Sequence, residues 1–355
     1  MKAYRIASIP GDGIGHEVVA EGVRVVAAAA RRFGFTCAFE ELPWGSQHYL
    51  ERGRMMPDDA LTRLSGFDAI YLGAVGHPKV PDHTTLNGLL LPIRRAFEQY
   101  ANVRPTVLFP GVATPLAEKE KPIDIVLVRE NTEGEYAQVG GTVHGGTETE
   151  VAVQTAVFTR RGTERIIRFA FERARSEKRR SVTSITKSNA QGHSMTFWDR
   201  VFREVAAEFP EIATSSILVD AAAMELIRRP WSFDVIVASN LFGDICSEIT
   251  ATVTGGLGLA PSANLDPTRR HPSMFEPVHG SAPDIAGRGW ANPIGAILSA
   301  AMMLAWLGET PAAAAIHAAV VDVLEDGHLR TRDIGGEAST VEVGTAVAGR
   351  VRGGG

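Results

Sequence analysis

The stretch SIPGDGIGHEV, residues 8–18, sets the first structural expectation for this chain. Three glycines at alternate positions follow an apolar run at residues 4–9 and precede a helical pattern. This order predicts a strand, a tight turn and a helix, which together begin an α/β fold. A dinucleotide-binding turn has the spacing G-x-G-x-x-G, whereas residues 11–15 read GDGIG. We therefore interpret the turn first as a structural connection, with cofactor binding as the alternative.

Similar apolar runs recur along the chain, and helical patterns separate most of them. The predicted strands are residues 4–9, 36–42, 69–72, 123–128, 182–186, 217–219 and 235–238. Such alternation predicts an α/β architecture with a largely parallel core. Residues 137–160 differ, because they are rich in Gly and Thr and then alternate in polarity. They predict a hairpin-like excursion that contacts a second subunit.

Length and charge limit the class of protein. The chain has 355 residues, more than the ~250–300 at which a single core stops growing, so two domains are expected. The net charge is −5 and both signs are scattered, which argues against a nucleic-acid-binding surface. The basic cluster at residues 173–181 is interpreted as a solvated helix end.

Membrane and export signals are absent from the sequence pattern. The apolar stretch at residues 296–308 is shorter than the ~20 residues of a bilayer span, so it predicts a buried helix. The N-terminus lacks the apolar segment of a signal peptide. Cys37 and Cys246 are far apart and show no metal-binding spacing. The sequence therefore predicts a cytoplasmic protein without a membrane partner.

Acidic residues gather around the stretch SNLFGDICSEI, residues 239–249. Asp244 and Glu248 are four positions apart, so on a helix they share one face. Asp220 ends another predicted strand, and ligands of open α/β sheets bind at strand ends. Three converging carboxylates would suit Mg²⁺ or Mn²⁺. The alternative is an ordinary acidic pair on a helix surface.

Arginines form a second set of candidates. Arg94 and Arg104 lie in LLLPIRRAFEQYANVRP, and Arg129 directly follows an apolar strand. A guanidinium group grips carboxylates in a bidentate manner, so these residues are candidates for binding an acidic substrate. For Arg129 the simpler interpretation is a salt bridge to Glu130 or Glu133.

Two further features gain meaning only if they converge with these groups. Tyr136 and Lys187 are unremarkable as single residues. The loop FEPVHGSAPDIAGRGWANP, residues 275–293, is rich in turn formers yet carries His279, Asp284 and Asn292. That composition predicts a ligand-binding loop, with a structural loop that covers a sheet edge as the alternative.

These motifs occur together, in this order, in the metal-dependent β-decarboxylating hydroxyacid dehydrogenases. That family contains isopropylmalate, isocitrate, homoisocitrate, tartrate and D-malate dehydrogenases. The chain resembles it from IPGDGIGHEV to LRTRDIGGEASTVEVG, and SNLFGDI and FEPVHGSAPDIAG are the most specific motifs. The resemblance implies the two-domain α/β fold of isopropylmalate and isocitrate dehydrogenases, not a Rossmann fold. It implies a cofactor-binding domain of residues 1–102 plus 255–355, and a central domain of residues 103–254 with the dimer interface and metal site.

The resemblance also implies roles for individual residues. The acid/base pair would be Tyr136 and Lys187, and the arginines that grip the substrate would be Arg94, Arg104 and Arg129. The metal ligands would be Asp220, Asp244 and Glu248, although most relatives have aspartate at the last position. The cofactor site would comprise Asn87, Asn189, His279, Gly280, Ser281, Ala282, Asp284 and Asn292. The glycine turn would then be mainly structural.

Cofactors and partners follow from the same resemblance. Asp284 would bind the adenosine ribose and repel a 2′-phosphate, which favours NAD over NADP. The metal would be Mg²⁺ or Mn²⁺, and several relatives also use K⁺. In relatives Lys187 and Asp220 come from the second subunit, which implies a homodimer with a shared site. The partner molecule would be a small dicarboxylic hydroxy acid.

Substrate choice is less sharply indicated. The segments VPDH, LPIR, TKSNAQ and RENTEGEY resemble D-malate and tartrate dehydrogenases, which predicts oxidative decarboxylation of D-malate or tartrate. Asn87 stands where those enzymes carry tryptophan and isopropylmalate dehydrogenases carry glutamate. Residues 89–91, three leucines, could line an alkyl pocket or form a buried helix face. The alternatives are a 3-isopropylmalate dehydrogenase and, in another class, a non-catalytic regulatory subunit.

Overall fold

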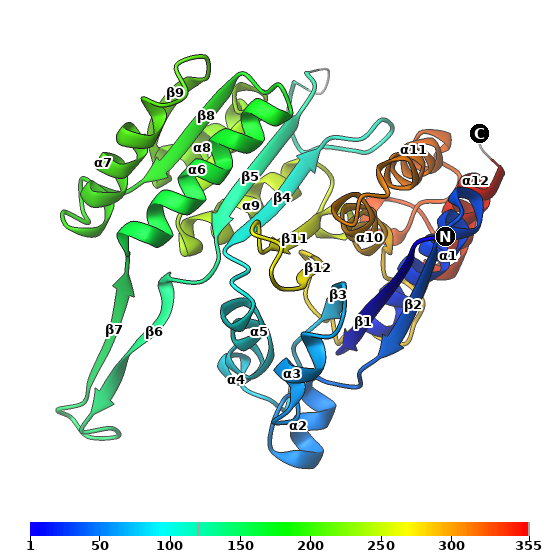
Figure 1. The fold of residues 1–355 in the computed structure, drawn as a ribbon, viewed down its shortest axis with the longest axis horizontal. Helices are drawn as coiled ribbons and strands as arrows, with labels where there is room; N and C mark the ends of the chain where they lie inside the picture. Colours follow the sequence, from blue (N-terminus) through cyan, green and yellow to red (C-terminus); the bar gives the residue numbers. More distant parts are fainter. Residues whose placement is uncertain (119–120, 354–355) are drawn as a thin grey trace. The chain divides into compact units, whose positions relative to one another are not determined.

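The strand, turn and helix expected at the start of the chain are present in the computed structural model, which describes residues 1–118 and 121–353 (Figure 1). Strand β1 (Ala3–Gly11) leads through the glycine turn into helix α1 (Gly15–Phe33). Helix α1 buries Val18, Val25 and Ala29, which share one face because helical positions seven and four apart align.

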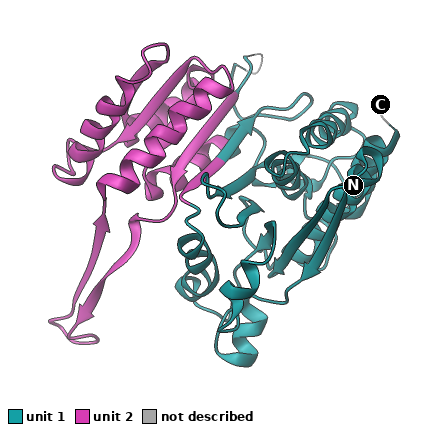
Figure 2. Cartoon of the chain, in the orientation of Figure 1, with its two compact units in different colours: residues 1–99, 104–123, 251–355 teal, residues 100–103, 124–250 magenta. Residues whose placement is uncertain are grey.

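The described residues form two units (Figure 2). Unit 1 comprises residues 1–99, 104–123 and 251–355, and unit 2 comprises residues 100–103 and 124–250, with residues 119–120 and 354–355 outside the description. The chain therefore leaves unit 1, builds most of unit 2 and returns. The roles expected for the two parts of the sequence, cofactor binding and dimerisation, remain predictions.

Unit 1 is built on a mainly parallel sheet. Its strands lie in the order β2 (Thr36–Glu41), β1, β3 (Ala69–Ala74), β12 (Ser273–Pro277), β11 (Pro261–Leu265) and β4 (Ala101–Val107). Strand β1 runs parallel to β2 and β3, β3 is parallel to β12, and β11 is antiparallel to β12. Strand β4 begins in unit 2 and ends in unit 1.

Helices cover both faces of this sheet. One group contains α1, α10 (Ile294–Trp306), α11 (Thr310–Asp326) and α12 (Thr340–Gly353). The remaining helices of unit 1 are α2 (Ser46–Arg52), α3 (Ala60–Leu64), α4 (Asp82–Thr85), the π-helix η1 (Leu86–Leu90), α5 (Leu91–Ala96), η3 (Leu257–Leu259) and η4 (Arg332–Ile334). Side chains alternate along β3, so Tyr71 reaches α10 while Ile70 and Leu72 join a core cluster with Leu89 and Leu90. Two buried faces explain the continuous apolar run of this strand.

The main-sheet strands of unit 2 run parallel to one another. Their order is β5 (Asp124–Glu130), β10 (Val235–Ala238), β8 (Ser181–Thr186) and β9 (Ala213–Leu218). The helices of this unit are α6 (Arg160–Ser176), α7 (Ser194–Ala206), α8 (Val219–Arg228), η2 (Pro230–Ser232) and α9 (Asn240–Val253). Trp198 on α7 is fully buried, and its indole Nε1 donates to Ser184 Oγ over 2.9 Å. This bond satisfies the one polar atom of the largest core side chain.

A separate two-stranded sheet projects from unit 2. Strands β6 (Gly134–Val143) and β7 (Val151–Val157) pair antiparallel, so residues 137–160 do contain the expected hairpin. Its contact with a second subunit remains a prediction. Among the helices in the described part of the chain, none has the length and apolar character of a membrane span.

The α/β class is confirmed, but several strands lay outside the sequence prediction. Strands β4, β11 and β12 carry Pro105, Asn264 and Glu276 within short segments, so they lack a clear apolar run. Strand β9 begins at Ala213, before the predicted start at Ile217. The prediction began too late because the first residues of this strand are mostly polar and exposed, so they show no apolar run. Sheet pairing, which depends on distant partners, decided these elements.

Candidate functional site

The glycine turn of residues 11–15 contacts a loop that lies far along the chain. Ile14 N donates to the Ser281 carbonyl over 2.9 Å. A Cβ on Gly13, whose φ is 54°, would lie 2.0 Å from that same carbonyl oxygen. Gly11, with φ 74°, similarly faces the Ala74 carbonyl. Glycine is needed at these positions because the backbones approach too closely for any side chain.

The loop that the turn contacts carries most of the predicted cofactor residues. His279 Nδ1 lies 2.9 Å from the Gly280 carbonyl oxygen, which can only accept a hydrogen bond. This nitrogen therefore carries the proton of the neutral ring and donates it to the carbonyl. The other nitrogen, Nε2, is buried and has no hydrogen-bond partner among residues 1–118 and 121–353. Burial lowers the pKa of His279 below its usual value. The loop therefore presents an unfilled hydrogen-bond acceptor.

The pKa shift of His279 predicts a pH dependence of stability. The unfolded chain binds a proton here as the pH falls through about 6.5, whereas the folded protein resists it. The unfolded state then binds more protons, so the free energy of unfolding should decrease with falling pH in this range. Urea unfolding across about pH 5–8 should show this slope, reduced in His279→Gln. Equal slopes in both proteins would contradict the prediction.

The remaining loop residues differ in how firmly they are held. Ala282 has a φ of 39°, an uncommon conformation for a residue with a side chain. Ser281 is buried, whereas Gly280 and Asp284 are exposed. Asn292 is nearly buried: its Nδ2 donates to Asp333 Oδ2 over 3.0 Å and its Oδ1 accepts from Ile294 N. The side chain of Asn292 thus fixes the end of the loop.

Two of the predicted substrate arginines lie in unit 1. Arg94 on α5 is buried, and its Nη2 donates to Glu276 Oε1 over 2.8 Å. Asn264 Nδ2 donates to the same oxygen over 2.7 Å. Within the described part of the chain, the Nε of Arg94 is buried without a hydrogen-bond partner, so one donor is left for an anionic ligand. Arg104 on β4 is also buried, with 7% of its surface exposed.

Asn87 lies on the π-helix η1, and its Nδ2 donates to the His83 carbonyl over 2.7 Å. A π-helical turn often marks a functional site. Asn87, together with His83 and Arg54, lines a cavity of about 720 Å³ in unit 1.

A polar cluster in unit 2 joins three of the predicted site residues. Arg129 Nη1 donates to Asp244 Oδ1, and Tyr136 Oη donates to Asp244 Oδ2 over 2.9 Å. The Arg129 guanidinium lies 5.3 Å from the centre of the Tyr136 ring. Asn240 Oδ1 accepts from Arg129 Nε and Nη2. The cluster holds a tyrosine hydroxyl, a carboxylate and a guanidinium in direct contact.

The simpler interpretation of Arg129 was a salt bridge to Glu130 or Glu133, but the structure shows other partners for these two acids. Glu130 accepts hydrogen bonds from Thr132, and burial raises its pKa. Glu133 accepts from Thr159. The ion pair of Arg129 is made with Asp244, on helix α9.

The second pair in unit 2 is Lys187 and Asp220. Lys187 Nζ donates to Asp220 Oδ1 over 2.8 Å, and this hydrogen bond lowers the pKa of Asp220. Lys187 follows β8 and Asp220 lies in the first turn of α8, so two neighbouring strand ends bring them together. Asn189 lies in the turn after Lys187 and is exposed.

The three predicted metal carboxylates do not form one cluster within the chain. Across residues 1–118 and 121–353, no three His, Cys, Asp or Glu side chains lie close enough to hold a metal ion. Asp244 and Glu248 are one turn apart on α9, while Asp220 pairs with Lys187. Their carboxylate chemistry fits a hard divalent cation.

Neutralising Asp244 should destabilise unit 2. Arg129 is only 2% exposed, so Asp244→Asn would remove a carboxylate that pairs with a buried cation. Asp244 itself is 32% exposed, and water replaces part of the lost interaction. We expect a loss of about 1–3 kcal/mol in the free energy of unfolding, measured by urea titration. The control Asp58→Asn, which breaks the exposed pair with Arg54, should change little, and an equal loss in both would contradict the argument.

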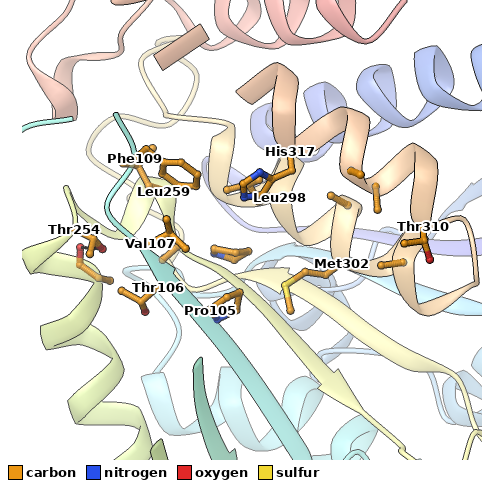
Figure 3. Close-up of a pocket in the computed structure, with 17 residues that line it drawn as sticks. Pro105, Thr106, Val107, Phe109, Thr254, Leu259, Leu298, Met302, Thr310 and His317 are labelled. Atoms are coloured by element: carbon orange, nitrogen blue, oxygen red, sulfur yellow. Dashed lines mark hydrogen bonds between the residues drawn. The ribbon is translucent and has the colours of Figure 1, made fainter. Parts of the chain in front are cut away.

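An apolar cavity of about 350 Å³ lies elsewhere in unit 1 (Figure 3). Its walls include Val107, Leu298 and Met302, and the His317 ring lies 5.7 Å from that of Phe109. None of the predicted site residues lines it. The cavity is therefore not part of the candidate site.

The sequence prediction missed residues that hold the candidates in place. Glu276 binds Arg94, and Asn240 binds Arg129. Both lie inside motifs that were singled out, FEPVHGS and SNLFGDI. A buried arginine needs such a partner. The positions of Glu276 and Asn240, close to the ends of apolar strands, were the sequence signal that could have identified them.

Comparison with known proteins gives one consistent result. A family model described as isocitrate/isopropylmalate dehydrogenase matches residues 5–347. A probable tartrate dehydrogenase/decarboxylase of Bacillus subtilis is 52% identical over 355 residues, covering 99% of each chain. D-malate dehydrogenase [decarboxylating] of Escherichia coli is also 52% identical, covering 98% of each chain. The crystal structure of isocitrate dehydrogenase from Methylococcus capsulatus matches with a TM-score of 0.90 and 37% identity, covering 98% of this chain and 99% of that one.

Proposed function

Because the chain belongs to the isocitrate/isopropylmalate dehydrogenase family and is an oxidoreductase, we propose that it oxidatively decarboxylates D-malate or tartrate with NAD and a divalent metal. The observation that carries this proposal is the naming of two full-length relatives at 52% identity. The contact of Tyr136, Asp244 and Arg129 supports it, since these groups suit proton transfer, cation binding and carboxylate binding. The relatives lend no support to a non-catalytic subunit.

The loop of unit 1 offers a chemically suitable site for the adenosine half of NAD. The neutral His279 ring has an unfilled acceptor at Nε2, which fits the exocyclic amino group of adenine. The exposed Asp284 carboxylate can accept hydrogen bonds from ribose hydroxyls and repels a 2′-phosphate. Gly280, Ser281, Ala282 and Asn292 would shape the same site, with Asn189 near the nicotinamide and Asn87 at the boundary with the substrate.

The cation site would be shared between two subunits. Asp244 and Glu248 would contribute from one chain and Asp220 of the partner subunit from the other, holding Mg²⁺ or Mn²⁺. Within a single chain Asp220 is bonded to Lys187, so the pair would reach the neighbouring site together. K⁺ is an additional requirement to test.

A homodimer also suits the exposed apolar residues of unit 2. Met224 and Ile227 on α8 are 57% and 53% exposed. The hairpin exposes four valines at about half of their surface: Val139, Val143, Val151 and Val153. Such patches are typical of contact surfaces. Both cysteines are free thiols, which suits the cytoplasm.

The proposed mechanism assigns one task to each group. Arg94, Arg104 and Arg129 would bind and orient the two carboxylates of the substrate. Lys187 would accept the proton of the C2 hydroxyl while the hydride leaves C2. Tyr136 would donate a proton to the enol carbon once CO₂ has left. When bound, NAD would supply the hydride acceptor, and the divalent cation would stabilise the negative charge that develops during decarboxylation.

Burial favours D-malate or tartrate over 3-isopropylmalate. Leu89 and Leu90 belong to the core cluster of unit 1, and Leu91 is 2% exposed. This burial supports the interpretation of the three leucines as a buried helix face. Asn87, whose amide donates to the His83 carbonyl, stands where tartrate and isopropylmalate dehydrogenases differ from one another.

The test is NADH formation by the purified protein with NAD⁺, Mn²⁺ and K⁺. D-malate, L-tartrate, meso-tartrate, 3-isopropylmalate and isocitrate are offered at matched concentrations. We expect the highest kcat/KM for D-malate or a tartrate. A preference for 3-isopropylmalate would contradict the substrate assignment, and no activity with any of the five would contradict the proposed function.

A further inference from the structure

The sequence motif that follows the glycine turn contains an acid that the proposed reaction does not use. Glu17 lies in the first turn of α1 and is partly exposed. Its Oε1 accepts a hydrogen bond from Gly287 N over 2.6 Å, and its Oε2 accepts from Gly289 N over 3.0 Å. Both oxygens are thus bonded to the backbone of the loop that carries His279 and Asp284.

The loop shape explains why these two amides point at one carboxylate. Gly287 and Gly289 have φ angles of 77° and 66°, so the backbone turns in the left-handed region on both sides of Arg288. This turn brings alternate amides to the same side. Upstream, Ile285 N donates to the Ala282 carbonyl, which closes a tight turn around Asp284. Any residue with a side chain would strain the two glycine positions.

Other contacts hold the two ends of this loop. Ile14 N donates to the Ser281 carbonyl over 2.9 Å, and Thr340 N donates to the Gly289 carbonyl over 2.9 Å. Glu17 lies three residues after Ile14, one helical turn along. The start of α1 therefore forms hydrogen bonds with the loop on both sides of Asp284.

The negative charge of Glu17 strengthens its two hydrogen bonds to the loop. Hydrogen bonds to an ionised acceptor are about twice as strong as those between neutral groups. Each carboxylate oxygen is already bonded to a loop amide, so Glu17 is placed to hold the loop and not to contact a ligand itself.

We propose that Glu17 is a positioning residue that fixes residues 281–289 in the shape that receives the adenosine half of the dinucleotide. This inference rests on the proposed function, because it assigns a task to the loop that would bind NAD. The motif at residues 8–18 would then act on the cofactor indirectly. Gly13 allows the backbone of the loop to approach closely, and Glu17 holds the loop by hydrogen bonds.

The experiment compares Glu17→Gln, Glu17→Ala and the control Asp68→Asn in the full chain. Gln keeps the size and one acceptor but places an NH₂ group against the second amide, and Ala removes both bonds. Asp68 is also exposed and accepts a backbone bond, from Arg5 N over 2.7 Å, but lies outside the loop contacts. Its replacement removes the same charge, and the amide oxygen of asparagine can still accept the backbone bond.

We expect the KM and Kd for NAD⁺ to rise roughly tenfold in Glu17→Gln and further in Glu17→Ala. The kcat and the KM for the hydroxy acid should remain close to those of the wild type, because the reacting groups are untouched. Hydrogen–deuterium exchange without cofactor should show faster exchange in residues 281–289 of both variants. Asp68→Asn should match the wild type in every measurement.

Two outcomes would overturn the inference. If the wild type binds NAD⁺ and both Glu17 variants keep its KM, Kd and loop exchange, the end contacts suffice and Glu17 does not position the loop. If the wild type neither binds nor reduces NAD⁺, the proposed function fails and the inference fails with it. Equal thermal midpoints for Glu17→Gln and the wild type will show that the variant is folded.

Discussion

Replacing Tyr136 with phenylalanine should abolish most of the decarboxylating turnover and leave the fold intact. The hydroxyl of Tyr136 lies 2.9 Å from Asp244 Oδ2, and it is the only group that this substitution removes. The ring, which packs beside the Arg129 guanidinium, is retained. Loss of a positioned proton donor costs about 10²–10⁴-fold in rate. We expect a fall of this size in kcat with the KM for NAD⁺ unchanged.

The measurement is NADH release with the preferred hydroxy acid, and Tyr100→Phe is the matched control. Tyr100 also lies in unit 2, and its ring centre is 4.2 Å from the Arg165 guanidinium. It belongs to none of the predicted site residues, so its variant should keep nearly full activity. If Tyr136→Phe turned over at the wild-type rate, the assigned role of Tyr136 would be wrong.

Replacing Lys187 with methionine should remove the oxidation step selectively. Lys187 is proposed to accept the hydroxyl proton, a task that a thioether cannot perform, so oxidation should slow by about 10²–10⁴-fold. Decarboxylation of the corresponding 2-keto acid needs no such base. Lys187→Met should therefore still release CO₂ from the keto acid, whereas Tyr136→Phe should be defective in the protonation that follows.

The two activities can be followed separately, by NADH absorbance and by CO₂ release. Lys178→Met is the control, because Lys178 is an exposed lysine of the same unit. Equal loss of both activities in Lys187→Met would contradict the division of labour between Lys187 and Tyr136. Asp220, bonded to Lys187, would lose its partner in this variant.

Local patterns in the sequence were sufficient to predict the α/β class. Apolar runs such as residues 69–72 have the length of strands, and the helix after the glycine turn has a clear period of buried positions. Motifs such as SNLFGDI were specific enough to indicate the family, which the comparisons confirm. The candidate residues come from the same motifs, and their roles await the experiments above.

Strands without an apolar run could not be predicted in this way. Strand β12, SMFEP, is fully buried because β3 and β11 flank it, although its own residues show no strand pattern. The stability of such a strand comes from its pairing with neighbouring strands and not from its own composition.

The sequence by itself determined the fold class, the family and the residue types available for chemistry, because these depend on local periodicity and on short motifs. Only the tertiary structure decided which distant groups meet. Glu17 contacts Gly287 across 270 residues, Arg94 contacts Glu276 across 182, and Tyr136 contacts Asp244 across 108. The physical reason is that a charged or polar side chain can be satisfied by many partners, and chain folding selects one of them by bringing it within hydrogen-bond distance.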